Sequence, residues 1–162
     1  MDIVQQTMAD GPGLRISMYC AGCNHHCRGC HNPQSWDINN GKWMSIDQIM
    51  DIIKSDSISN VSFSGGDPFY QAPAFTCLAK RIKEETAKNI WCWTGFTIEE
   101  LYEDPEKAEL LKYIDTLVDG PFILEQRDTT LRFRGSPNQR IIHLTPLEED
   151  ICPGAVELIK YR

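Results

Sequence analysis

The sequence predicts one α/β domain with mostly parallel strands, spanning residues 1–162. Its length of 162 residues is typical of a single domain. No internal repeat, low-complexity segment or Pro/Gly/Ser-rich linker divides it. Segments with the period-two pattern of strands alternate with segments of helical periodicity. This order is typical of parallel sheets whose strands are joined by right-handed crossovers.

Four segments have the apolar character expected of buried strands: residues 14–19, 58–63, 89–93 and 114–118. Residues 141–144 and 156–161 carry weaker versions of the pattern. The sequence is therefore compatible with six strands.

The helices between these strands have recognisable beginnings. Ser45 stands three residues before Gln48, which forms a capping box ahead of an apolar stripe. Residues 97–100 repeat this pattern, and residues 104–112 begin with Asp-Pro, a favourable helix start. One further helix is indicated by apolar residues spaced for a single face, which are Phe75, Leu78, Ala79 and Ile82.

Composition excludes several classes of protein. The net charge of −7 argues against a general binder of nucleic-acid backbones. No window of about 18 apolar residues predicts a transmembrane helix. The N-terminal segment lacks the basic start and apolar core of a secretory signal, so the expected location is the cytoplasm. Thiols stay reduced there, and the seven cysteines are expected to be ligands or free thiols.

Polar or small residues follow each predicted parallel strand. They are Cys20, Gly65, Gly66, Asp67, Thr94, Gly95, Asp119 and Gly120. Because ligands of parallel α/β sheets bind beyond the carboxyl ends of the strands, these clusters are expected to converge on one site.

Four cysteines lie close together in the segment after the first predicted strand: Cys20, Cys23, Cys27 and Cys30. In one interpretation all four bind a structural zinc ion, although zinc ribbons separate their cysteine pairs by more residues. In the other, Cys23, Cys27 and Cys30 hold an iron–sulfur cluster with one iron left open, and Cys20 is not a ligand. The chemistry favours the second interpretation and leaves the first open.

The other histidines and cysteines have simpler interpretations. His25 and His26 are expected to be solvated loop residues, with a ligand role as the minor alternative. Cys77, Cys92 and Cys152 are expected to be small buried hydrophobic residues.

Several motifs resemble those of a known superfamily. The C-x3-C-x2-C spacing of residues 23–30, followed by Gly-Gly-Asp-Pro at residues 65–68, resembles the radical S-adenosylmethionine superfamily. Residues 10–15 and 30–32 are similar to the activating enzymes of glycyl radical proteins. Residues 93–101, 118–122 and 134–139 are similar to one branch, the activators of anaerobic ribonucleoside-triphosphate reductases. The resemblance spans roughly residues 8 to 145.

This resemblance implies a fold and a chemistry. The fold would be a partial, open barrel of the (β/α)6 type. Cys23, Cys27 and Cys30 would ligate a 4Fe–4S cluster whose open iron binds S-adenosylmethionine. The activity would be reductive cleavage of that cofactor, which generates a glycyl radical on the anaerobic reductase. An electron donor such as flavodoxin or ferredoxin would complete the system.

The resemblance also implies cofactor-binding roles. Gly65, Gly66 and Asp67 suit the methionyl end, because glycines let the backbone approach closely, while a plain strand-exit turn is the alternative. Asp119 would accept from the methionyl ammonium, or would be a turn residue. The remaining contacts would be made by Gly29, Cys30 and His31 to the adenine and by Thr94 to the ribose. Residues 134–136 would support the cofactor, dock the partner or form a loop.

Two rival functions remain. One is an activase of another glycyl radical enzyme, such as pyruvate formate-lyase. Those activases are longer, and some carry extra ferredoxin-like cysteines that this sequence lacks. The other is a zinc-stabilised binding module without catalysis.

Overall fold

The computed structural model describes residues 2–144. In this part of the chain, six strands form one sheet whose spatial order, β1-β2-β3-β4-β5-β6, is also their order in the sequence. The strands are β1 (Asp2–Thr7), β2 (Arg15–Cys20), β3 (Asn60–Gly65), β4 (Ile90–Trp93), β5 (Thr116–Asp119) and β6 (Arg140–His143). The helices are α1 (Ile46–Ser55), α2 (Ala72–Glu85), α3 (Ile98–Glu103) and α4 (Pro105–Leu111). Short 3-10 turns cover Pro33–Ser35, Ile38–Asn40, Pro68–Gln71 and Leu124–Gln126.

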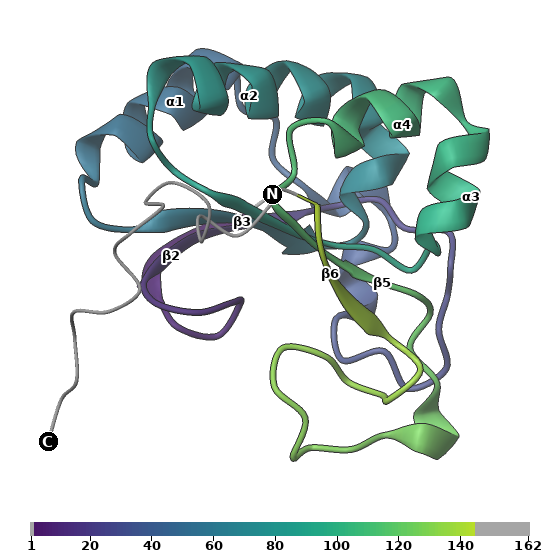
Figure 1. Cartoon of the computed structure of the whole chain (residues 1–162). Helices are drawn as coiled ribbons and strands as arrows, with labels where there is room; N and C mark the ends of the chain where they lie inside the picture. Colours follow the sequence, from purple (N-terminus) through teal and green to yellow (C-terminus); the bar gives the residue numbers. More distant parts are fainter. Residues whose placement is uncertain (1, 145–162) are drawn as a thin grey trace, which may run out of the picture.

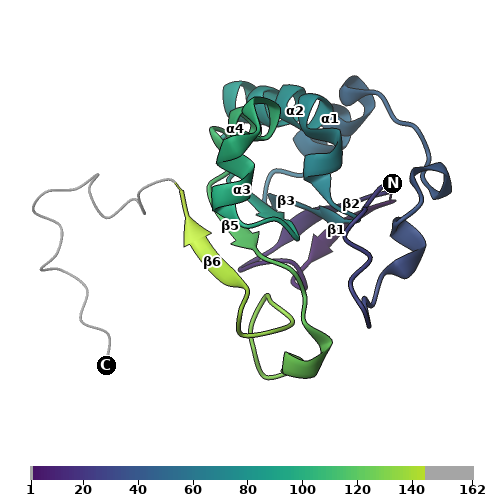
Figure 2. The same ribbon diagram turned by 90° about the vertical axis from the view of Figure 1, so that its right-hand side faces the viewer.

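The centre of the sheet is parallel. Strands β2, β3, β4 and β5 pair with one another in parallel, whereas β1 and β6 pair antiparallel with β2 and β5. The crossovers contain α1, then α2, then α3 with α4. All four helices lie on one face of the sheet (Figures 1 and 2). Successive right-handed crossovers along an unreversed strand order produce this one-sided arrangement.

The expectation of a mostly parallel α/β fold is confirmed, but a (β/α)6 barrel is not observed. The sheet is open, because β1 and β6 each pair with one neighbour and form its edges. In a closed barrel every strand has two neighbours. Within residues 2–144 only three helical crossovers occur, and the edge strands β1 and β6 are attached by loops instead of helices.

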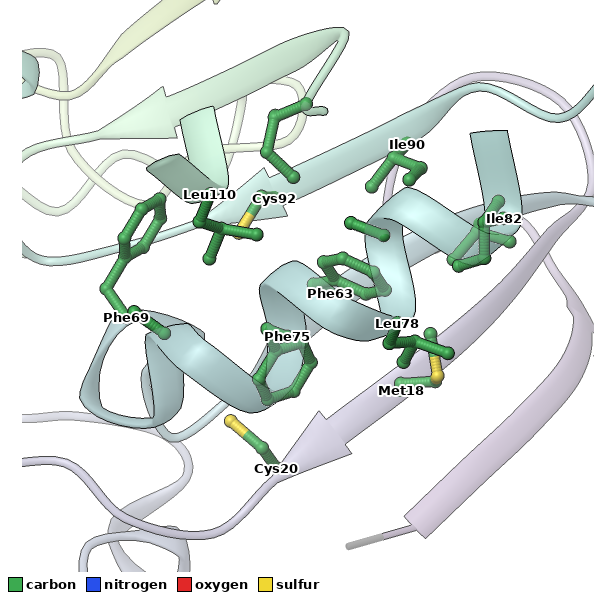
Figure 3. Close-up of a cluster of buried hydrophobic side chains, with 14 of the residues drawn as sticks. Met18, Cys20, Phe63, Phe69, Phe75, Leu78, Ile82, Ile90, Cys92 and Leu110 are labelled. Carbon is green, nitrogen blue, oxygen red and sulfur yellow. The ribbon is translucent and has the colours of Figure 1, made fainter. Parts of the chain in front are cut away.

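The main hydrophobic core lies between the sheet and the helices. Alternate residues of each parallel strand point toward the helices and belong to this core, and Figure 3 shows four of them, Met18, Cys20, Phe63 and Cys92, together with Phe75 of α2. The four residues that predicted the inner face of α2 are all buried: Phe75, Leu78, Ala79 and Ile82. Burial of apolar surface at about 25 cal/mol per Å² makes this layer the main source of stability.

The opposite face of the sheet carries buried polar side chains. Arg15, Ser17 and Ser62 are 0% exposed on this face. The segment between β1 and β2 contributes to its cover, because Ser62 Oγ donates to the Asp10 carbonyl at 2.6 Å. The segment between β5 and β6 also packs here, with the Phe133 ring 5.5 Å from that of Trp91. These two segments leave a cavity between them at the strand ends.

Local sequence signals placed most elements correctly. The capping boxes at Ser45 and Thr97 are both formed, and Asp104 caps α4. Strand β1 was not predicted, because its side chains are exposed or half-buried and it joins the sheet through its backbone. The strand predicted at 156–161 and the residue Cys152 lie outside the described residues.

One cysteine expectation was wrong. Cys92 is buried as expected, but Cys77 is exposed, since it lies on the outer side of α2. Within residues 2–144 no helix combines the length and apolar character needed to cross a bilayer.

Candidate functional site

A cavity of about 360 Å³ opens at the carboxyl ends of the parallel strands, on the face without helices. Its walls come from residues 9–10, 23–36, 64–67, 93–95 and 120–139. The predicted convergence of strand-end clusters is therefore largely realised. Three segments far apart in the sequence meet here: the cysteine loop, defined as residues 20–32, and the ends of β3 and β4.

Three cysteines of this loop line the cavity. Cys23, Cys27 and Cys30 are half-buried free thiols. Burial, as the largest cause, raises the pKa of the Cys23 thiol. The loop is held by its backbone, because the Gly22 N–H donates to Ser35 O at 2.7 Å. The Cys30 N–H likewise donates to Cys27 O at 3.0 Å.

These thiols fit the donor set of an iron–sulfur cluster. Thiolates are its usual ligands, and each binds a separate iron, so the sulfurs need not converge on one point. Within residues 2–144, no group of three or more His, Cys, Asp and Glu side chains surrounds a single-ion position.

Cys20 differs from the other three. It is 1% exposed and belongs to the hydrophobic core, on the helix side of β2. Burial raises the pKa of its thiol to about 12, so it remains protonated at neutral pH. Figure 3 shows its sulfur directed toward Phe75.

The two glycines at the end of β3 allow backbones to meet. Gly65 has φ +101°, and a Cβ there would lie 2.4 Å from the Cys20 nitrogen. A Cβ on Gly66 would lie 2.5 Å from Gly22 O. The Gly66 N–H donates to Cys20 O at 2.7 Å. The glycines thus hold the cysteine loop against the strand end, and both also line the cavity.

Asp67 is a fully buried centre of hydrogen bonds that joins β3, β4 and the cysteine loop. Its carboxylate accepts from Phe69 N–H (3.0 Å), Thr94 Oγ1–H (2.8 Å) and Gly95 N–H (3.0 Å), and lies 2.8 Å from His25 Nε2. The predicted site residues Asp67 and Thr94 are therefore in direct contact with each other, at the wall of the cavity.

His25 is not a solvated loop residue, so that expectation was wrong. Its side chain is 17% exposed and its ring packs edge-on against Tyr70 and Phe96. The sequence offered one usable signal, a histidine inside the cysteine spacing, but its partner Asp67 is 42 residues away. His26 behaves more nearly as expected, because it is exposed and stacks on Trp36.

Asp119 is not among the described residues that line the cavity. It shares the helix-facing side of β5 with Leu117, because side chains alternate along a strand. Its carboxylate accepts from the Ile98 N–H at 2.8 Å and from Arg140 Nε at 3.0 Å. The two-residue period of a strand, which places Asp119 on the same side as the buried Leu117, could have predicted this orientation from the sequence.

The residues around Cys30, the last cysteine of the loop, lie at the cavity and beside it. Cys30 and His31 line the main cavity. Gly29 and His31 line a smaller adjoining space of about 230 Å³. Gly29 has φ +73°, a conformation that favours glycine.

The far wall of the cavity was largely missed by sequence reasoning. Trp93, Phe122 and Phe133 provide its aromatic surface. The Trp93 Nε1–H donates to Phe133 O at 2.8 Å. Arg134, singled out from its motif, lines this wall and donates through Nη1 to Gln139 O at 2.8 Å. This wall is thus built largely by the segment between β5 and β6, which packs against the end of β4.

Comparisons with known proteins show what this chain is similar to. A family model described as a 4Fe-4S single cluster domain matches residues 9–142. The chain is 42% identical over 144 residues to the anaerobic ribonucleoside-triphosphate reductase-activating protein of Vibrio cholerae serotype O1, covering 84% of this chain and 91% of that protein. The proteins of the same name from Haemophilus influenzae and Escherichia coli K12 are 40% and 36% identical, covering 83% and 85% of this chain and 90% and 93% of theirs.

Proposed function

The chain belongs to the family of anaerobic ribonucleoside-triphosphate reductase-activating proteins, with a 4Fe-4S single cluster domain, and we propose that it activates such a reductase by generating a glycyl radical. The observation that carries the proposal is the placement of Cys23, Cys27 and Cys30 on one cavity at the strand ends. The names of the relatives favour this activity over the pyruvate formate-lyase alternative.

In this proposal the three thiolates hold a 4Fe–4S cluster with one open iron. When bound, such a cluster would supply the electron for cleavage of the C5′–S bond of S-adenosylmethionine, to give methionine and, with a hydrogen atom taken from the partner's glycine, 5′-deoxyadenosine.

The cofactor contacts are also part of the proposal. The backbone at Gly65 and Gly66 suits the methionyl end, because both glycines line the cavity. Cys30 and His31 would contact the adenine through their backbone, with Gly29 beside them. Asp119 would act indirectly at most, because its carboxylate is bound to Arg140 and α3.

The proposal also includes a cellular location and an electron donor. A cytoplasmic location and a flavodoxin or ferredoxin as electron donor both accord with a reducing compartment.

The test uses protein reconstituted with iron and sulfide without air. S-adenosylmethionine and a strong one-electron reductant are added, with and without the anaerobic reductase. We expect 5′-deoxyadenosine to form and the reductase to acquire a glycyl radical signal in electron paramagnetic resonance. Cys27→Ala should give neither product.

Other outcomes separate the parts of the proposal. Deoxyadenosine without a glycyl radical would mean that the partner is wrong. No deoxyadenosine in either mixture, from protein with verified iron and sulfide, would contradict the radical chemistry itself. Stoichiometric zinc without sulfide in protein isolated without air would establish the non-catalytic alternative.

A further inference from the structure

His25 connects the cysteine loop to the rest of the molecule. It lies midway between Cys23 and Cys27 in the sequence, and its ring leaves the loop to enter a space formed by other elements. Its centroid is 5.5 Å from that of Tyr70 and 4.5 Å from that of Phe96, both in edge-on arrangements. The ring is thus enclosed by residues that follow β3 and β4.

The polar end of this ring meets a buried partner. His25 Nε2 lies 2.8 Å from Asp67 Oδ2, whose side chain is 1% exposed. A carboxylate only accepts, so Nε2 carries the proton in this contact. Asp67 is itself held by Phe69, Thr94 and Gly95. The histidine therefore binds a fixed acceptor instead of a mobile one.

Gly95 provides the room for this ring. A Cβ on Gly95 would lie 2.5 Å from His25 Cδ2 and 2.8 Å from His25 Nε2. Any larger residue at position 95 would have to displace the imidazole. The absence of a side chain at Gly95 therefore leaves the space that the His25 ring fills, although 70 residues separate the two in the sequence.

His26 shows that this arrangement is specific to His25. It occupies the next position of the same loop, is exposed, and stacks on Trp36 with centroids 4.7 Å apart. Trp36 belongs to the segment that directly follows the loop. His26 therefore packs locally and is a matched control within the loop.

We propose that His25 is a positioning residue: by its hydrogen bond to Asp67 and its packing between Tyr70 and Phe96, it fixes the cysteine loop on the ends of β3 and β4. Cys23 and Cys27 are thereby held at the cavity that Gly65 and Gly66 also line. The consequence for cofactor binding rests on the proposed function, whereas the attachment of the loop does not.

Two substitutions separate the hydrogen bond from the packing. His25→Phe keeps a ring between Tyr70 and Phe96 but removes the donor to Asp67. His25→Gln places an amide N–H where Nε2 stands and keeps the donor. His26→Phe changes the neighbouring histidine without touching Asp67. All three are compared with the wild-type chain.

The first measurement is hydrogen exchange of the backbone amides of residues 22–30, in protein with and without reconstituted iron and sulfide. We expect His25→Phe to speed exchange about tenfold, because a hydrogen bond to a charged group is lost. His25→Gln and His26→Phe should stay close to the wild-type rates.

The second measurement is the spectrum of the reduced, reconstituted protein as S-adenosylmethionine is added. The concentration that gives half of the spectral change should rise about tenfold in His25→Phe and be restored in His25→Gln. Iron and sulfide per chain should be unchanged, since all cysteines remain. Loss of iron in His25→Phe that His25→Gln restores would also support the positioning role.

Wild-type exchange rates and an unchanged titration in His25→Phe would overturn the proposal. If His25→Phe does not fold, Gly95→Ala tests the same attachment from the other side, because its methyl group enters the space of the ring. Wild-type rates of amide hydrogen exchange at residues 22–30 in folded Gly95→Ala would then overturn the proposal. If the wild-type spectrum does not respond to S-adenosylmethionine, the proposed function fails, while the exchange comparison still decides the role of His25.

Discussion

Gly29 in the cysteine loop lies directly against Leu124, so that a Cβ added to Gly29 would come within 2.6 Å of Leu124 Cδ1. An ion pair between Arg28 and Glu125, at 2.9 Å, joins the same two segments at the surface. The exposed pair adds little stability by itself. The close approach of glycine and leucine is what brings the loop against the segment that follows β5.

We expect Gly29→Ala to lower the free energy of unfolding by about 2 kcal/mol. About 1 kcal/mol comes from the left-handed backbone at φ +73°, and the rest from displacement of Leu124. Gly13→Ala is the control, because Gly13 has φ +71° and nothing within 4 Å of an added Cβ. Urea denaturation of both variants measures the difference. Equal losses would mean that Leu124 moves aside without cost.

Cys20 and Cys27 should respond differently to removal of the thiol. Cys20→Ala should retain iron and sulfide after anaerobic reconstitution, because its protonated thiol lies in the hydrophobic core. Its loss of stability should be about 1 kcal/mol, the usual result of a small core deletion. Cys27→Ala should lose the cluster. Iron and sulfide analysis decides, and a Cys20→Ala protein that binds no iron would reverse the assignment of ligands.

Arg15 should contribute strongly to stability through hydrogen bonds to neutral acceptors. Its buried guanidinium donates to Ser62 Oγ at 2.9 Å, to Asn89 Oδ1 at 2.7 Å and to the Val61 carbonyl. Arg15→Leu should lower the free energy of unfolding by about 3 kcal/mol, since buried acceptors lose their donors. Arg132→Leu, at an exposed position, should change it by less than about 0.5 kcal/mol. Comparable urea midpoints for the two variants would contradict this role.

The contacts of Arg140 make part of the free energy of unfolding dependent on pH. Arg140 binds Glu99 at 2.7 Å and also contacts Asp119. The hydrogen bond from Arg140 lowers the pKa of Glu99 from its ordinary 4.5 to about 2. Because this folded-state pKa is depressed, the stabilisation is present above pH 4.5 and is lost as the pH falls toward 2.

The variant Glu99→Gln tests this pH dependence. The difference in free energy of unfolding between wild type and variant should be largest near pH 6 and should shrink as the pH is lowered through this window. Salt should reduce it as well, because the Glu99 side chain is 66% exposed. A difference that is the same at pH 6 and pH 3 would show that Glu99 contributes no charge-dependent stability.

Local signals in the sequence were sufficient to predict most of the fold. Ser45 and Gln48 satisfy each other's backbone within one helical turn, so their spacing alone predicts the start of α1. The parallel order follows from strands alternating with such helices. Strand β1 gave no comparable signal, because its contribution is backbone pairing with β2, such as Ile3 with Met18.

The candidate site also combines features that the sequence predicts with features that only the structure shows. The sequence by itself determined which residues could ligate a cluster, because the spacing of Cys23, Cys27 and Cys30 is a local property of one loop. It also determined that this loop follows a strand end, where parallel sheets bind ligands.

Only the tertiary structure decided how that loop is held and which side chains face it. The contact of His25 with Asp67 spans 42 residues. The partners of the Asp119 carboxylate, Arg140 and the Ile98 N–H of α3, come from other segments, and the open edge of the sheet depends on where the crossovers stop. Spacing along the chain specifies local geometry. Contacts between distant segments depend instead on how whole layers pack, and no single segment carries that information.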